Sequence, residues 1–441
     1  ILFNLSKLDK NTLRIALPLI ASNITIPLVG FVDNMMMGQF GSAIYLGAIG
    51  LGSIIISYIL FSFGFIKSIT TGLVSQHSGS NDYKNLIIST YQVLFISMVI
   101  SFVLLFFRQE IIYFSLQIMN ASNEVKQSTK LYLDYRIWSI PAIFIRDILI
   151  GYYIGIQKIR LAMWISIVVN LINIIFDYYL VYFLNYGIEG IAIASLIAEY
   201  SIIFFVFFAF RNNEIFTSKM IQWTQIFRWS SIKDKVFINI DMFMRSLILM
   251  TVFLYFMSIG ASYGNLTLAA NTILINFFFI FSYGIDGFAH ASEVLVGYAV
   301  GKKDKNLIKN SIKSTGKLSL ILTFIYLLIF VLFDDNFINI ISQNTDIINL
   351  ASYFTYYLYM IFLFSFFAFW LDGVFIGAMR TKLLRNIMIF SGTSFFILET
   401  SFFGGNNDGL WLSFLIFFGL RSLFLSIFLY KYLKDNKFLE N

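Results

Sequence analysis

The sequence contains no cysteine among its 441 residues and only two histidines. The absence of cysteine excludes a disulfide framework, a thiolate metal site and a cysteine nucleophile. Charged residues are also scarce, at 12% of the chain, whereas soluble domains carry about 25%. Neither a phosphate-binding loop of the GxxxxGKS type nor an HExxH zinc motif occurs. We therefore expect no ATPase in this chain and no enzyme activity.

Apolar residues are abundant: 59% of the residues are hydrophobic, and the mean hydropathy is +0.79. Apolar stretches of about 20 residues or more recur along the whole chain, enough to cross a bilayer about 30 Å thick. Runs such as FISMVISFVLLFF do not alternate in polarity, which excludes an outer-membrane barrel. The sequence predicts an all-α integral membrane protein that spans the lipid bilayer.

Twelve membrane spans are predicted, and the first, from about Leu13, is expected to be a true span rather than a cleavable signal peptide. Since the sequence begins with Ile, we expect the natural start to lie further upstream. The predicted spans are 13–37, 45–75, 86–107, 127–155, 161–183, 189–210, 236–259, 266–300, 311–333, 347–378, 386–404 and 409–430.

Lysine and arginine are distributed unevenly between the two sets of loops. The loops on the side of the termini hold 22 of them, and the opposite loops hold three, Arg108, Lys126 and Lys130. This bias predicts a multi-pass protein of the inner (cytoplasmic) membrane with both termini in the cytoplasm. The net charge of +7 is therefore attributed to cytoplasmic loops, and no nucleic-acid partner is expected.

The two halves of the chain resemble each other at one constant offset in residue number, the repeat offset, which takes Gly151 to Gly373. GQFGSAIYLGA aligns with GASYGNLTLAA, GSNDYKN with GKKDKNL, and GYYIGIQKIR with GVFIGAMRTK. Three matches at one offset indicate an internal duplication of six spans. We predict two six-helix lobes, 1–212 and 236–441, joined by a cytoplasmic linker at 213–235. Because both copies start inside, a pseudo-twofold axis along the membrane normal relates them. This is the architecture of an alternating-access transporter, expected to be a monomer.

Polar residues inside the predicted spans gather near the outer end of the N-terminal lobe. The segment VNLINIIFDYYLVY places Asn170, Asn173 and Asp177 on one helix face. Asp33 and Ser195 are expected at the same depth, roughly 10 Å below the outer surface. Two carboxylates, an amide and a hydroxyl are oxygens that suit a proton or a sodium ion, so Asp33 and Asp177 are candidate Na⁺ ligands. The alternative is that these groups only hydrogen-bond between helices.

The repeat offset does not duplicate this set of polar residues. It takes Asp177 to Glu399, but it takes Asp33 to Tyr255. A role in the scaffold common to both lobes therefore does not explain the pair of carboxylates.

The C-terminal lobe carries polar candidates of its own for substrate contact or gating. They are Arg245, Asp286, His290, Glu293 and Asp372, and Met36 of the first span is a further candidate for the wall of a cavity. The alternative is an ion pair of Arg245 with Asp241 or Asp286. Five other charged residues of the spans are expected to form structural pairs, namely Lys67, Arg146, Asp147, Glu199 and Arg421.

Three segments resemble the multidrug and toxic compound extrusion (MATE) family over essentially the whole chain. They are PLIASNITIPLVGFVDNMMMG, NLINIIFDYYLVYFLNYGIEGIAIASLIAEY, and GASYGNLTLAANTIL followed by SYGIDGFAHASEVLVG. The subgroup that they resemble is the DNA-damage-inducible, DinF-like one. The resemblance implies two six-helix lobes around a V-shaped cavity, and export of organic cations in exchange for protons or sodium.

The resemblance also implies roles for single positions. It implies that Asp33, Asn173 and Asp177 form the coupling site with Ser195, where related proteins often have threonine. In the NorM-like subgroup, coupling carboxylates also lie in the C-terminal lobe. Asp286, Glu293 and Asp372 are the positions here that could correspond to them.

The predicted function is a secondary antiporter that exports drug-like, mostly cationic and lipophilic compounds, with H⁺ or Na⁺ as the coupling ion and no other cofactor. The same oxygens serve both ions, so the sequence leaves that choice open. The first alternative is a flippase for lipid-linked precursors, which would need a cationic cavity to hold a pyrophosphate. An intramembrane enzyme and a channel are further alternatives that the sequence disfavours.

Overall fold

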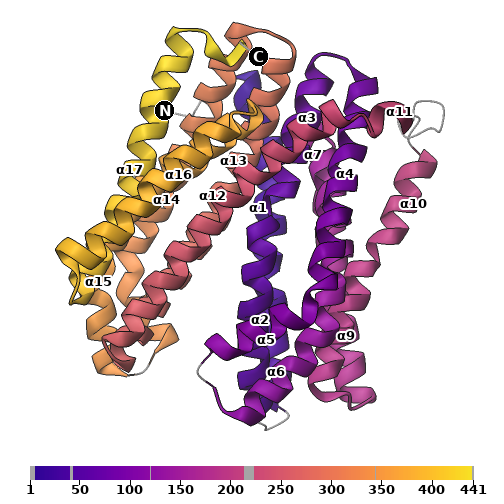
Figure 1. Ribbon diagram of the computed structural model, residues 1–441. Coiled ribbons are helices and arrows are strands. Elements are labelled where there is room, and N and C mark those ends of the chain that lie inside the picture. The colour runs from indigo at the N-terminus through magenta and orange to yellow at the C-terminus, as the bar shows by residue number, and fades with distance from the viewer. Residues whose placement is uncertain (1–4, 40–42, 120, 213–222, 343, 440–441) are drawn as a thin grey trace. The chain divides into compact units, whose positions relative to one another are not determined.

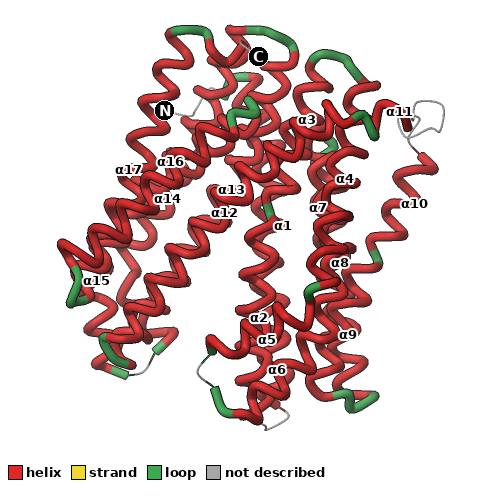
Figure 2. Tube along the Cα trace, in the orientation of Figure 1, coloured by secondary structure: helices red, strands yellow, loops and turns green. Residues whose placement is uncertain are grey.

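The computed structural model describes residues 5–39, 43–119, 121–212, 223–342 and 344–439. Within these ranges the chain is helical, and loops join the helices without any strand (Figure 2). Helices satisfy every backbone N–H and C=O internally, which is what a chain this apolar needs in a bilayer. Eleven of the described helices are long and apolar enough to cross a membrane, and α1 (Lys7–Gln39) covers the first predicted span. The prediction of an all-helical membrane protein is confirmed.

Helices of the first half of the chain follow α1 in the order drawn in Figure 1. They are α2 (Ala43–Phe63), α3 (Phe65–Gly79), α4 (Tyr83–Phe106), α5 (Arg108–Ile118), α6 (Asn123–Arg136), α7 (Ile140–Gly155), α8 (Ile159–Tyr178), α9 (Gly187–Tyr200) and α10 (Ile202–Asn212). Pro141 lies in the first turn of α7, after a short 3₁₀ segment at Ile137–Ser139. Proline has no backbone N–H to donate, so it is tolerated in the first turn of a helix but interrupts a helix that continues through it. Pro141 therefore explains why α6 ends and α7 begins at this point.

The second half is built from longer helices. They are α11 (Trp223–Ile226), α12 (Trp229–Ser262), α13 (Asn265–Gly301), α14 (Lys305–Ile341), α15 (Thr345–Gly377), α16 (Thr381–Leu398) and α17 (Asn407–Lys434). A π-helical segment follows α8 at Tyr179–Phe183, and another follows α16 at Glu399–Phe403.

Contacts divide the chain into two compact units. The N-terminal unit is Ala21–Asn239, and the C-terminal unit is Ile1–Ile20 together with Ile240–Asn441. The predicted lobes 1–212 and 236–441 stay a prediction, and most of the predicted linker, 213–222, lies outside the described residues. The compact units differ from the predicted lobes at the start of α1, which belongs to the C-terminal unit.

The first turns of α1 are bonded to α14. Ser314 donates a hydrogen bond of 2.7 Å to Asp9 and lies 3.0 Å from the Thr12 hydroxyl. Lys317 forms an ion pair of 2.7 Å with Asp9. Burial raises the pKa of Asp9, but the hydrogen bonds from Lys317 and Ser314, with those from Ser6, outweigh it and lower this pKa to about 2. These bonds assign the beginning of α1 to the C-terminal unit.

The two units share local structure at the repeat offset found in the sequence. Left-handed backbone occurs at Asn81 and Lys303, each with φ of 57°, and again at Gln157 and Met379, with φ of 61° and 55°. Few residues other than glycine adopt this conformation, so its recurrence at equivalent positions of the two copies supports the internal duplication.

Close helix contacts recur at the same offset. Gly151 and Gly155 of α7 approach the backbone carbonyls of Lys67 and Thr71 in α3, and Gly373 and Gly377 of α15 approach those of Ala289 and Glu293 in α13. A Gly-xxx-Gly pair lets two helix backbones come together in a membrane. Each unit is therefore organised around an equivalent pair of closely packed helices.

Candidate functional site

Asp33 of α1 and Asp177 of α8 lie together in the N-terminal unit. Their side chains lie close enough to act on each other, and the residues are only 6% and 0% exposed. No described N–H or hydroxyl group donates to either oxygen of Asp177 or to Oδ1 of Asp33. Two ionised carboxylates that are buried near each other repel, and a proton on one of them or a cation between them would relieve that repulsion.

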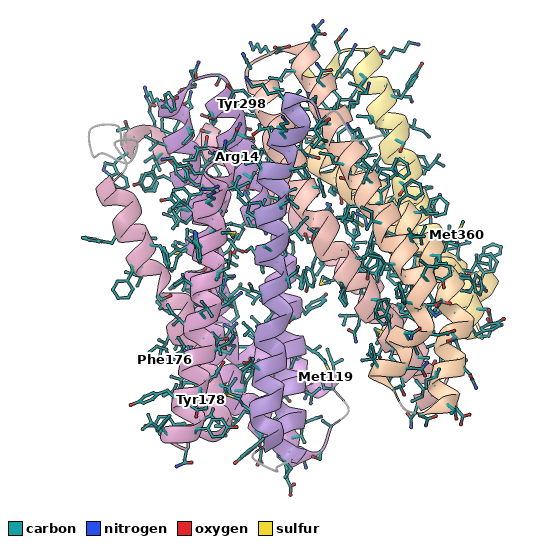
Figure 3. All side chains as sticks on the ribbon, turned by 180° about the vertical axis from the view of Figure 1, so that it is seen from behind. Arg14, Met119, Phe176, Tyr178, Tyr298 and Met360 are labelled. Atoms are coloured by element: carbon teal, nitrogen blue, oxygen red, sulfur yellow. The ribbon has the colours of Figure 1, made fainter. Side chains whose placement is uncertain are left out.

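The neighbours of Asp177 locate this pair along the unit. Figure 3 labels Phe176 and Tyr178 near the end of the N-terminal unit where Met119 also lies. Asp177 precedes the π-helical segment Tyr179–Phe183. Such segments inside helices are frequent at functional sites.

Asn173 and Ser195 are also brought together. Asn173 lies one turn before Asp177 and donates a hydrogen bond of 3.3 Å to the Ser195 hydroxyl of α9. Both residues are 5% exposed. Among the described residues no hydrogen bond links this pair to the two aspartates. Asn173 therefore lies on the same face of α8 as Asp177 and is bonded to Ser195 of α9.

Asn170 has a different neighbour. Its amide donates a hydrogen bond of 2.7 Å to the Thr25 hydroxyl of α1. This bond ties α8 to α1 two turns before Asp177, as expected for a polar contact between membrane helices. Met36, one turn after Asp33 on α1, is 4% exposed and therefore packs in the interior.

Arg136 at the end of α6 is a residue that the sequence analysis did not select. Its charge acts on both Asp33 and Asp177 and on the buried Tyr132. Its Nε has no hydrogen-bond partner in the described structure. An arginine inside a predicted span was the signal that could have found it.

In the C-terminal unit, Arg245 pairs with a partner that the sequence did not predict. Its guanidinium forms an ion pair with Asp372 of α15, and Arg421 of α17 forms another of 2.7 Å with the same carboxylate oxygen. Asp241, the partner suggested by its place one turn away, is bonded to Arg385 and Thr381 instead. Arg245 reaches Asp372 because α12 and α15 belong to one packed unit, which spacing along the chain does not reveal.

The remaining candidates of this unit lie on α13. His290 and Glu293 form a pair of 3.0 Å, and both are buried. Asp286, one turn earlier, is half-buried. In the N-terminal unit Arg146 forms an ion pair of 2.5 Å with Glu199 and one of 3.5 Å with Asp147. The expected structural pairs are thus present at Arg146, Asp147, Glu199 and Arg421.

Multivalent metal ions are held in proteins by clusters of side chains. Across the described part of the chain, no group of three or more histidine, aspartate or glutamate side chains could hold such an ion. The Asp33–Asp177 pair offers four carboxylate oxygens, which suit a proton or a monovalent ion.

Helical spans, a duplicated six-span unit and a buried pair of carboxyl groups define a polytopic membrane transporter. The model of the MatE family matches residues 18–179 and 242–399, and the chain belongs to this family, the multidrug and toxic compound extrusion transporters.

Similarity to single proteins extends over most of the chain. DNA damage-inducible protein F of Escherichia coli (strain K12) is 29% identical over 427 residues, covering 96% of this chain and 92% of that protein. A probable multidrug resistance protein NorM of Photorhabdus laumondii is 24% identical over 354 residues, covering 78% of this chain and 76% of that protein. The crystal structure of the eukaryotic MATE transporter AtDTX14 matches with a TM-score of 0.87 at 15% identity, covering 98% of each chain. The first of these relatives agrees with the predicted DinF-like subgroup.

Proposed function

We propose that the protein is a secondary antiporter that exports organic, mostly cationic and lipophilic compounds in exchange for H⁺ or Na⁺. The observation that carries the proposal is the pair Asp33–Asp177, which is buried, lacks an ion pair in the described structure and spans two helices. An ionisable group at membrane depth costs at least about 2.5–3.5 kcal/mol, so a pair of them is expected to have a function. The names of the relatives support export of drugs as that function.

Exchange of substrate for a coupling ion would depend on two charge states of the Asp33–Asp177 pair. A proton or sodium ion on Asp33–Asp177 removes repulsion between α1 and α8, and its loss restores that repulsion. Because the positive charge of Arg136 acts on both aspartates, it competes with a cation bound between them and so helps to release that cation. The ion must bind the outward- and inward-open states with different affinity, since otherwise it would shift no equilibrium between them.

Placement in the inner membrane with both termini in the cytoplasm belongs to the same proposal, and the distribution of lysine and arginine supports it. We further propose a monomer without an enzymatic activity. The alternative flippase would hold a pyrophosphate in a cationic cavity. The three buried carboxylates without an ion pair in the described structure, Asp33, Asp177 and Glu399, favour a cationic substrate instead.

The test is transport of a fluorescent organic cation by purified protein in proteoliposomes under an imposed proton or sodium gradient. Asp33→Asn keeps the size of the side chain and removes its charge, so gradient-driven transport is expected to fall to the level of empty liposomes. Asp346→Asn, at an exposed aspartate in the first turn of α15, is the matched control and should transport like the wild type. Full gradient-driven transport by Asp33→Asn would refute the proposed coupling site.

A further inference from the structure

Buried carboxylates fall into two groups when their partners are compared. The described residues contain eight, namely Asp9, Asp33, Asp177, Glu199, Asp241, Glu293, Asp372 and Glu399. Five of them form an ion pair with lysine, arginine or histidine. Within the described structure, Asp33, Asp177 and Glu399 form none. Burying a charge without a partner costs several kcal/mol, so Glu399 needs an explanation of its own.

Glu399 occupies the place in the C-terminal unit that Asp177 occupies in the N-terminal unit. The repeat offset relates the two residues. Asp177 lies two residues before one π-helical segment, and Glu399 is the first residue of the other. Tyr255, which corresponds to Asp33, donates a hydrogen bond of 2.7 Å to Oε2 of Glu399. The same two positions therefore meet in both units, but one of the carboxyl groups is replaced by a phenol.

The other polar groups of the N-terminal site are replaced by aromatic rings. Phe395 and Phe417 stand where Asn173 and Ser195 stand, and their ring centroids are 6.2 Å apart. The Tyr255 ring packs edge-on against Phe395 and Phe396, with centroids 5.9 and 5.1 Å away. The duplicated position has thus kept one negative charge and lost the surrounding oxygens.

This change alters which cation the position suits. A small inorganic ion needs several oxygen ligands to replace its water, and here one carboxylate and one hydroxyl are available. A carboxylate among aromatic rings suits an organic ammonium or phosphonium group, which is weakly hydrated and is attracted by ring faces. Glu399 itself is 4% exposed and Tyr255 is half-buried, so Tyr255 is the more accessible residue of the pair.

We propose that Glu399, with Tyr255, binds the cationic group of the transported organic compound. The inference rests on the proposed function, in which the protein binds both a coupling ion and a substrate. It assigns these two binding roles to different copies of the repeat. The N-terminal pair takes the coupling ion, and the C-terminal position takes the substrate.

Equilibrium binding of radiolabelled tetraphenylphosphonium to the purified full-length protein, without any ion gradient, tests this assignment. Glu399→Gln removes the charge but keeps an oxygen that can accept the hydrogen bond from Tyr255. Because the attraction between the phosphonium and the carboxylate is lost, the dissociation constant should rise at least about tenfold, which is about 1.4 kcal/mol. Tyr255→Phe keeps the charge and should weaken binding by only about two- to fivefold.

Glu110→Gln, at an exposed glutamate in the first turn of α5, is the matched control and should bind like the wild type. If Glu399→Gln does not fold, Glu399→Asp, which keeps the charge, replaces it and should bind better than Glu399→Ala. Equal affinity of wild type and Glu399→Gln, equal affinity of the aspartate and alanine variants, or no binding by the wild type would overturn the inference. The antiport proposal is judged separately, by gradient-driven transport of Asp33→Asn.

Discussion

Gly373→Ala is expected to destabilise the closest helix contact of the C-terminal unit. A Cβ atom at this position would lie 2.8 Å from the carbonyl carbon of Ala289 and 2.9 Å from its Cα, and nearer still to the carbonyl oxygen. Ordinary contacts of a Cβ atom lie at 3.4–4 Å. These neighbours are backbone atoms that cannot rotate away, so α13 and α15 would have to separate by on the order of 1 Å.

The expected cost follows from two opposing effects. Overpacking of this kind costs about 1–3 kcal/mol, and replacing a helical glycine by alanine returns about 0.5–1 kcal/mol. The net loss should be roughly 1–2 kcal/mol, and separation of α15 should also move Asp372 away from Arg421. Thermal unfolding of the detergent-solubilised protein measures the change.

Gly419→Ala provides the control, because no other atom lies within 4 Å of a Cβ built there. This variant should be as stable as the wild type or slightly more stable. A melting temperature of Gly373→Ala that equals that of Gly419→Ala would show that the contact between α13 and α15 is not as tight as described.

Three further substitutions test the polar interior by thermal unfolding. Glu199→Gln removes the closer of the two carboxylates that pair with half-buried Arg146 and leaves only Asp147, 3.5 Å away, so it should cost about 1–3 kcal/mol; an unchanged melting temperature would contradict a structural pair. Asn271→Leu leaves the Trp411 indole N–H, 2.9 Å from the Asn271 oxygen, without its acceptor and should cost about 1–3 kcal/mol. Because the pKa of Asp9 is lowered from 3.8 to about 2, its stabilisation is present above pH 3.8 and lost toward pH 2. The stability difference between wild type and Asp9→Asn should narrow over that interval, and a constant difference would refute the role of the charge.

Periodicity and composition predicted much of the local structure. Apolar stretches predicted the spans, because a helix is what satisfies the backbone in lipid. The repeat offset, read from three short matches, reappears in the left-handed loop residues Asn81 and Lys303. The proximity of Asp33 and Asp177 was also predicted, because the predicted orientation of their two helices placed both residues at the same depth in the membrane.

Side-chain contacts between helices that are distant in the sequence were not predicted. The sequence offered Asp241 and Asp286 as partners of Arg245, because both are acidic residues near it in position or depth, whereas the actual partner is Asp372 of α15. The predicted depth of a residue in the membrane gives its position along its own helix. It does not show which other helices pack against that helix. For the same reason the bond between Asp9 and Lys317, which joins the start of α1 to α14, had no signal in the sequence.

The proposed antiport requires that substrate and coupling ion move in opposite directions through a site that includes Asp177. A direct measurement is ion movement driven by substrate. An inward gradient of an organic cation is imposed on proteoliposomes without any pH or sodium gradient, and dyes trapped inside report protons and sodium. Entry of the organic cation is expected to drive one of these ions outward in the wild type and not in Asp177→Asn. Entry of the organic cation without movement of either ion, or with equal ion movement in Asp177→Asn, would contradict the proposed antiport.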